Sequence, residues 1–159
     1  MRIFKKILLM LLCLSLLSGC GAVSQTPSPG EIADQLKSYS PESISWTELN
    51  KTDASSYFSF DSETVSDFNG YISNSEEYFD IIAVFKLPDD EARDNVLKGV
   101  SFLLNTSENN FKLVSDLQHS KILNKIIAEK DDIIILCIVD NYSRISKYLV
   151  EDLGAKIIS

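Results

Sequence analysis

The chain has 159 residues, with 15 Lys or Arg against 23 Asp or Glu, so its formal net charge is −8. This acidic balance argues against a protein that holds nucleic acid, because nucleic-acid binding needs a basic surface. It equally argues against a domain that lies flat on anionic lipid.

The N-terminus has the layout of an export signal. Arg2, Lys5 and Lys6 precede residues 7–17, which are apolar apart from Ser15. A basic start followed by a short apolar run is typical of a secretory signal peptide. The run is too short for a membrane-spanning helix, which needs about 20 apolar residues.

The apolar run ends in LSGC, residues 17–20, which resembles the lipobox of bacterial lipoproteins. In that family the cysteine thiol receives a diacylglycerol and the leader is cut off before it. The resemblance implies a signal peptide over residues 1–19 and a covalent diacylglycerol on Cys20, with no further cofactor. Two acyl chains hold a protein stably at a membrane. We therefore expect anchorage at the extracytoplasmic face of the cell membrane; an ordinary signal peptide with a chance cysteine is the alternative.

The mature chain would be more acidic than the whole chain and would keep one free thiol. Loss of the three basic leader residues leaves 12 basic against 23 acidic residues, a net charge of −11. Cys13 leaves with the leader and Cys20 takes lipid, so Cys137 has no disulfide partner. Cys137 lies in the apolar segment IIILCIV, which favours a buried core residue over a nucleophile.

A flexible tether is predicted over residues 20–30, which comprise the lipidated cysteine and a segment of small and polar residues with two prolines. The domain then spans residues 31–159. Its first helix is predicted to begin at Ser28, which can cap it, with Pro29 in the first helical position. Glu31 completes an S-x-x-E capping box.

Three segments then favour strands. Residues 56–60, SYFSF, alternate in polarity and predict a short strand. Asn69-Gly70 in DFNGYIS predicts a turn between two strands. Residues 78–87 are rich in aromatic and β-branched side chains and predict the central strand.

The longest predicted helix begins at Pro88 and Asp89, and its apolar residues recur at helical spacing. A break at residues 105–110 separates it from a second helical piece that carries Phe111. The apolar segments KIIAE and IIILCIV flank KDD and predict a β-hairpin.

A last helix is predicted to begin at Asn141 or Ser143 and to end at Gly154, before a short edge strand in AKIIS. The whole order predicts an α+β fold in a single small domain. Its helices are expected on one face of a mostly antiparallel sheet.

The sequence offers little for catalysis or for metal binding. His119 is the only histidine, and no G-x-S-x-G segment surrounds a serine. One histidine and one buried cysteine cannot fill the usual ligand set of zinc. We therefore expect no catalytic residue and no metal ligand.

The segment VSDFNGYISNSE, residues 65–76, resembles the calcium loop of an EF-hand. Asp67, Asn69 and Glu76 fall at its third, fifth and twelfth positions. Val65 stands where the first carboxylate is needed, and the flanks favour strands over helices. A polar hairpin is the favoured alternative, and weak calcium binding between Asp67 and Glu76 stays open.

The segment IAVFK, residues 82–86, resembles the central strand of small lipoproteins of Clostridia-type Firmicutes that share a domain of unknown function. Their layout is a lipobox, a polar tether, this strand, a charged helix, a hairpin and a terminal helix. The chain departs from their pattern at Ile81, where they often have glutamate, and at residues 131–133, where they often have Gly-Asn-Tyr. The resemblance implies a compact fold and a Gram-positive cell surface, and it implies no activity.

We therefore expect a non-catalytic binding or interaction module, whose partner is a protein or a small molecule. The alternative is a cell-surface hydrolase that uses carboxylates, which would need two of them to converge in a cleft. Tyr71, Tyr78 and Lys86, beside the predicted central strand, are the candidate ligand-binding residues. Cys20 is the expected lipidation site.

Overall fold

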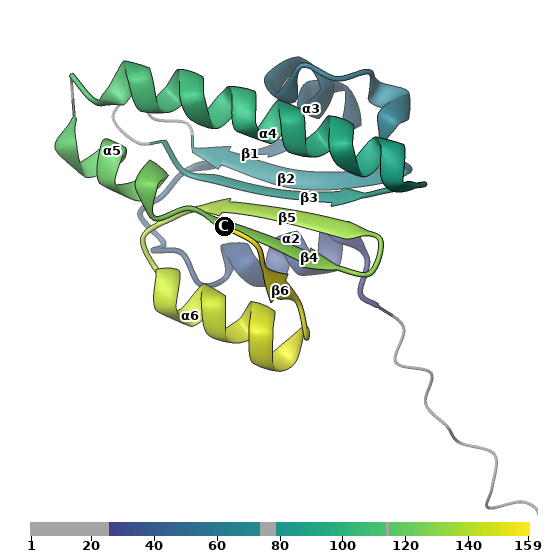
Figure 1. The fold of residues 1–159 in the computed structure, drawn as a ribbon. Helices are drawn as coiled ribbons and strands as arrows, with labels where there is room; N and C mark the ends of the chain where they lie inside the picture. Colours follow the sequence, from purple (N-terminus) through teal and green to yellow (C-terminus); the bar gives the residue numbers. More distant parts are fainter. Residues whose placement is uncertain (1–25, 74–78, 114) are drawn as a thin grey trace, which may run out of the picture.

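The computed structural model describes residues 26–73, 79–113 and 115–159, so Cys20 and Tyr78 lie outside the described residues. Figure 1 shows one layered domain built on a single sheet. Its elements in chain order are α2 (Pro29–Lys37), β1 (Trp46–Leu49), α3 (Lys51–Phe58), the 3₁₀ turn η1 (Ser62–Thr64), β2 (Asp67–Ser73), β3 (Ile81–Lys86), α4 (Asp90–Phe111), α5 (Asp116–Leu123), β4 (Ile126–Lys130), β5 (Ile133–Ile138), α6 (Tyr142–Lys147), the π-helical turn η2 (Tyr148–Asp152) and β6 (Lys156–Ile157).

The six strands lie in the order β1-β2-β3-β5-β4-β6, and every neighbouring pair is antiparallel. The central strand β3 pairs with β2, where Ile82 faces Tyr71, and with β5, where Ile82 faces Cys137. This confirms the expected α+β class, the antiparallel sheet and the single small domain.

Helices cover both faces of the sheet, which corrects the expectation that they pack on one face. Figure 1 places α3 and α4 on one side of the sheet, and α2 and α6 on the other. The reason lies in β3, because successive side chains of a strand point to opposite faces. Phe85 packs into the core beneath α3 and α4, whereas Ile82 and Val84 pack against α2 and α6. A strand that is apolar on both faces needs cover on both.

The first helix begins as predicted. The Ser28 Oγ accepts the backbone N–H of Glu31 at 3.3 Å, and the Glu31 carboxylate accepts the backbone N–H of Ser28 at 2.8 Å. The Ser28 hydroxyl also donates to this carboxylate at 2.8 Å. The backbone N–H and the hydroxyl of Ser28 both favour the charged carboxylate and lower the pKa of Glu31. Since α2 begins at Pro29, helical structure starts inside the segment expected to be tether.

Two of the predicted strand features are wrong. Residues 56–58 belong to helix α3, which begins with a capping box between Asn50 and Asp53. Asn69-Gly70 forms no turn and lies within β2. A Cβ on Gly70 would stand 2.7 Å from the carbonyl oxygen of Ile82, so this glycine permits close approach to β3.

The predicted helix break at residues 105–110 is also wrong, because α4 runs without interruption to Phe111. Leu104 and Ser107 stay buried through this stretch, and Phe111 packs against the core. The β4–β5 hairpin is confirmed, with Asp131 at a φ of 52° in its turn. The last helical segment begins at Asn141 as its N-cap, and the edge strand β6 follows Gly154 at a φ of 71°.

Candidate functional site

Tyr71, one of the predicted ligand-binding residues, is 6% exposed and packs on the α2 face of the sheet. Its hydroxyl donates to the Oδ1 of Asp34 at 2.5 Å. The Nζ of Lys37 lies 3.9 Å from the centroid of its ring. Trp46 meets the same ring edge to face, with centroids 6.3 Å apart. Asp34 and Lys37 are three residues apart on α2, a spacing that puts both on one helix face.

Burial is the main cause that raises the pKa of the Tyr71 phenol well above its usual range, and the bond to Asp34 adds to it. The phenol therefore stays a hydrogen-bond donor at physiological pH. It holds the Asp34 carboxylate in a fixed position.

The partners of Tyr71 line an open groove of about 600 Å³. Its walls combine charged, hydroxyl and apolar side chains, and we call it the Trp46 groove. The lining residues are Asp34, Lys37, Ser38, Ser40, Pro41, Glu42, Ile44 and Trp46. Tyr71 itself packs beneath this surface, so its role there is support.

Lys86 lies far from Tyr71. It ends β3 opposite Asp67, whereas Tyr71 faces Ile82, four residues back along the strand. At about 3.3 Å per residue, this is a separation of roughly 13 Å. The ammonium of Lys86 lies 3.9 Å from the Asp132 carboxylate, at the surface. The structure therefore does not bring these two candidates together, and the third, Tyr78, lies outside the described residues.

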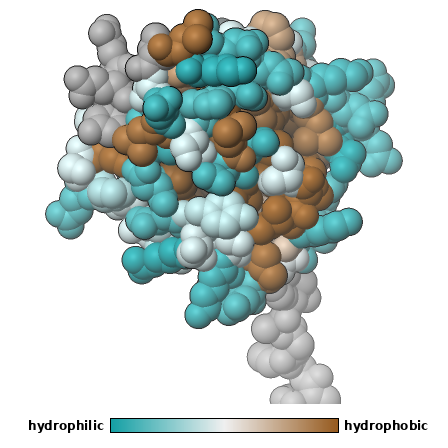
Figure 2. Space-filling view, turned by 60° about the vertical axis from the view of Figure 1, so that its left-hand side comes forward, coloured by the Kyte–Doolittle hydropathy of each residue, from teal (hydrophilic) through white to brown (hydrophobic). Residues whose placement is uncertain are grey.

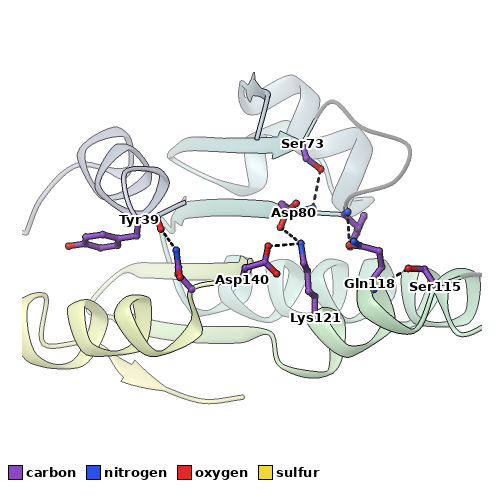
Figure 3. A network of polar contacts seen from close by, with 9 residues as sticks. Tyr39, Ser73, Asp80, Ser115, Gln118, Lys121 and Asp140 are labelled. Carbon is purple, nitrogen blue, oxygen red and sulfur yellow. Dashed lines mark hydrogen bonds and ion pairs between the residues drawn. The ribbon is translucent and has the colours of Figure 1, made fainter. Parts of the chain in front are cut away.

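An ion-pair network lies at the end of the sheet where β3 begins, with two buried members and the exposed Asp140 (Figure 3). Asp80 has no exposed surface, and Lys121 of α5 is 6% exposed. The Lys121 Nζ lies 2.8 Å from the Oδ1 of Asp80 and 3.1 Å from the Oδ2 of Asp140. We call these three residues the Lys121 network.

Neighbouring polar contacts fix the chain around this network (Figure 3). The backbone N–H of Asp80 donates to the Ser73 Oγ at 3.1 Å, and that of Phe79 donates to the Oε1 of Gln118 at 2.9 Å. Asn141 donates through its Nδ2 to the backbone carbonyl of Tyr39. These contacts join β2, α5, the β5–α6 turn and the segment after α2 at one end of the fold.

Burial raises the pKa of Asp80, and the Lys121 ammonium opposes the shift. A displaced pKa can mark a catalytic group, but such a group must reach a substrate. Asp80 is fully buried and lines none of the described cavities. The Lys121 network is therefore best explained as a structural contact that holds α5 against the end of the sheet.

Sequence reasoning missed this network. In the sequence, Asp80 stands directly before an apolar strand and Lys121 lies on a helix. Charged side chains in such places are usually exposed, so neither residue alone indicates that it is buried.

A second carboxylate-lined depression, of about 190 Å³, lies where α4 begins beside the β4–β5 hairpin. The Arg93 guanidinium binds both carboxylate oxygens of Glu129, at 2.6 and 3.0 Å. This bond is the main cause that lowers the pKa of Glu129. A general acid at neutral pH needs the opposite shift.

Three other expectations can be compared with the described residues. Cys137 is buried, and burial raises the pKa of its thiol to about 12, which confirms a core residue. Residues 67–73 are extended in β2, so they do not form an EF-hand loop, and Glu76 lies outside the described residues. Over the ranges described, no group of three His, Cys, Asp or Glu side chains is placed to hold a metal.

The surface at the α5 end carries several exposed apolar side chains. Figure 2 brings this end forward and shows apolar areas separated by hydrophilic side chains. Leu113, Leu117 and Leu123 are more than half exposed there, at 88%, 60% and 54%. Among the described helices, none is both long and apolar enough to cross a bilayer.

Comparison with protein-family models finds no matching family. Searches of curated proteins and of solved structures find no match either.

Proposed function

We propose that the chain is a lipid-anchored module at the extracytoplasmic face of the cell membrane that binds a ligand or partner without catalysis. The sequence around Cys20 supports the anchor, because a basic start, an apolar run and LSGC stand in the right order. The position of the Trp46 groove relative to the tether supports the binding role.

The tether and the groove lie at opposite ends of the sheet. Thr26, the first described residue, donates through its hydroxyl to Asp131 in the β4–β5 turn at 3.1 Å. Trp46 instead pairs with Ser73, at the end where β3 begins and β5 finishes. Six residues of strand separate these ends, about 20 Å. A domain held at the hairpin end therefore presents the groove away from its anchor.

The alternative, a hydrolase that uses carboxylates, receives less support from the same geometry. Asp80 and Asp140 converge on Lys121, but the first is fully buried. Glu129 is held in its charged form by Arg93. Neither arrangement combines an accessible carboxylate with a raised pKa, which an acid–base pair at neutral pH requires.

Site-specific photo-crosslinking in intact cells tests the proposal. A photoreactive amino acid replaces Ile44 on the groove, and a matched probe replaces the exposed Lys147 on α6. We expect adducts from position 44 that are absent from position 147 and are lost when Cys20→Ala removes the anchor. Equal adducts at both positions, or none at either despite normal expression, would contradict a binding role for this end.

A further inference from the structure

We propose that the Trp46 groove binds a neutral oligosaccharide. This inference rests on the proposed binding role and names the class of ligand. Four properties of the groove carry it: its aromatic surface, its mixed hydrogen-bonding groups, their fixed positions and its charge.

The apolar part of the groove suits the face of a sugar ring. Trp46 is partly exposed beside Ile44 and Pro41. A pyranose ring presents C–H groups on its faces and hydroxyls around its rim, so it packs on an aromatic plane while its rim stays polar. Small-ligand sites are typically apolar surfaces with a few placed polar groups, and the volume of about 600 Å³ lies in their usual range.

The polar part supplies both donors and acceptors. Lys37 offers an ammonium donor, and Asp34 and Glu42 offer carboxylate acceptors. In the part of the chain that the structure describes, none of these three side chains takes part in an ion pair. Each hydroxyl of a sugar is both a donor and an acceptor, so one ring can satisfy groups of both kinds.

Two of these groups are already held in place. The Tyr71 hydroxyl fixes Asp34, and the Tyr71 ring lies beneath the Lys37 ammonium at 3.9 Å. Polar side chains that are fixed before binding lose less conformational entropy when the ligand arrives. Tyr71, packed in the core on this face, thus holds both groups from beneath the groove.

The charges of the groove disfavour an anionic ligand. Two carboxylates in the groove, on a chain with net charge −8, repel a polyanion. A cationic ligand would be attracted by Asp34 and Glu42 and opposed by the Lys37 ammonium, so the spermidine titration distinguishes it from a neutral ligand. A neutral polyhydroxyl ligand avoids this repulsion.

Binding can be followed by intrinsic fluorescence, because Trp46 is the only tryptophan of the chain. The full chain, in a detergent without a sugar head group, is titrated with chitotriose, cellotriose and maltotriose up to about 10 mM, a range that covers weak binding. We expect a saturable change in Trp46 emission with at least one trisaccharide. Spermidine, titrated in the same way, tests an organic cation.

Two groove variants and one control sharpen the test. Lys37→Met and Asp34→Asn should each weaken saccharide binding about tenfold or more, because hydrogen bonds to charged groups are strong. The amide introduced by Asp34→Asn keeps an oxygen acceptor for the Tyr71 hydroxyl. Lys147→Met is the matched control, since both lysines lie in the last turn of a helix, and it should bind like the wild type.

Unchanged Trp46 emission with all three trisaccharides, or a saturable response to spermidine alone, would overturn the saccharide assignment. Equal loss of affinity in the Lys147→Met control would overturn it as well. The crosslinking experiment in cells uses no saccharide, so adducts from position 44 would keep the binding role even where this assignment fails.

Discussion

The ammonium of Lys121 lies 2.8 Å from the Oδ1 of Asp80, and both side chains are almost fully buried. Asp140 approaches the same ammonium at 3.1 Å from the β5–α6 turn. One lysine thus joins α5 to two segments of the sheet end. Removing one partner of a buried ion pair strongly destabilises the fold, because it leaves the other charge buried without compensation.

Replacement of Lys121 by methionine should therefore cost about 3–5 kcal/mol of the free energy of unfolding. The substitution keeps an unbranched side chain, one atom shorter than lysine, but leaves the Asp80 carboxylate buried beside an apolar group. Urea denaturation measures the loss, with the exposed Lys147→Met as control. A loss below about 1 kcal/mol would show that Asp80 does not depend on this ammonium.

The same variant should acquire a pH dependence of known sign. Burial already raises the pKa of Asp80, and Lys121 is the group that opposes the rise. A carboxyl whose pKa is higher in the folded protein than in the unfolded chain favours folding at low pH. This contribution is fully present below the unfolded pKa and is lost as the pH rises through the folded pKa. Lys121→Met should thus be closest to wild type near pH 4 and furthest from it near pH 8. Adding Asp80→Asn should remove this trend.

Gly99 should tolerate no side chain. A Cβ there would stand 2.2 Å from the carbonyl oxygen of Phe58, where α3 ends against α4. Gly99→Ala should destabilise the fold by about 1–3 kcal/mol, although alanine favours helices. Gly30→Ala, whose Cβ would meet its nearest atom at 4.0 Å, is the control and should be neutral or slightly stabilising. Similar melting temperatures for the two variants would contradict the close packing of α3 on α4.

The Arg93–Glu129 pair should respond to acid in the opposite direction. The bond to Arg93 lowers the pKa of Glu129. The pair therefore stabilises the fold at pH values above the pKa of Glu129 in the unfolded chain, and this stability is lost as the pH falls through its pKa in the folded protein. The difference in melting temperature between wild type and Arg93→Gln should shrink from pH 7 toward pH 3. A difference that stays constant over this range would rule out the ion pair as its cause.

Local signals in the sequence predicted much of the fold. Four predicted features that depend on neighbouring residues are confirmed. They are the Ser28 capping box, the apolar strand β3, the β4–β5 hairpin and the end of the last helix at Gly154. The α3 helix was missed because SYFSF alternates like a strand. The Asn50 capping box before it would have indicated the helix.

The remaining features depend on contacts between distant segments. Gly70 is a glycine because β3 passes close to it, and Asn69-Gly70 alone is typical of a turn. The Trp46 groove combines α2 with the loop that leads into β1, and Tyr71 joins it only through the register of β2. Such pairings cannot be obtained from local periodicity.

The measurement that tests the central claim most directly is metabolic labelling with a fatty acid, followed by membrane fractionation. Wild type is compared with Cys20→Ala and with Cys13→Ala, which changes another cysteine of the leader region. The account predicts labelled, membrane-bound protein for wild type and Cys13→Ala, and unlabelled, released or mislocalised protein for Cys20→Ala. Equal labelling and fractionation of all three proteins would contradict a lipid anchor at Cys20.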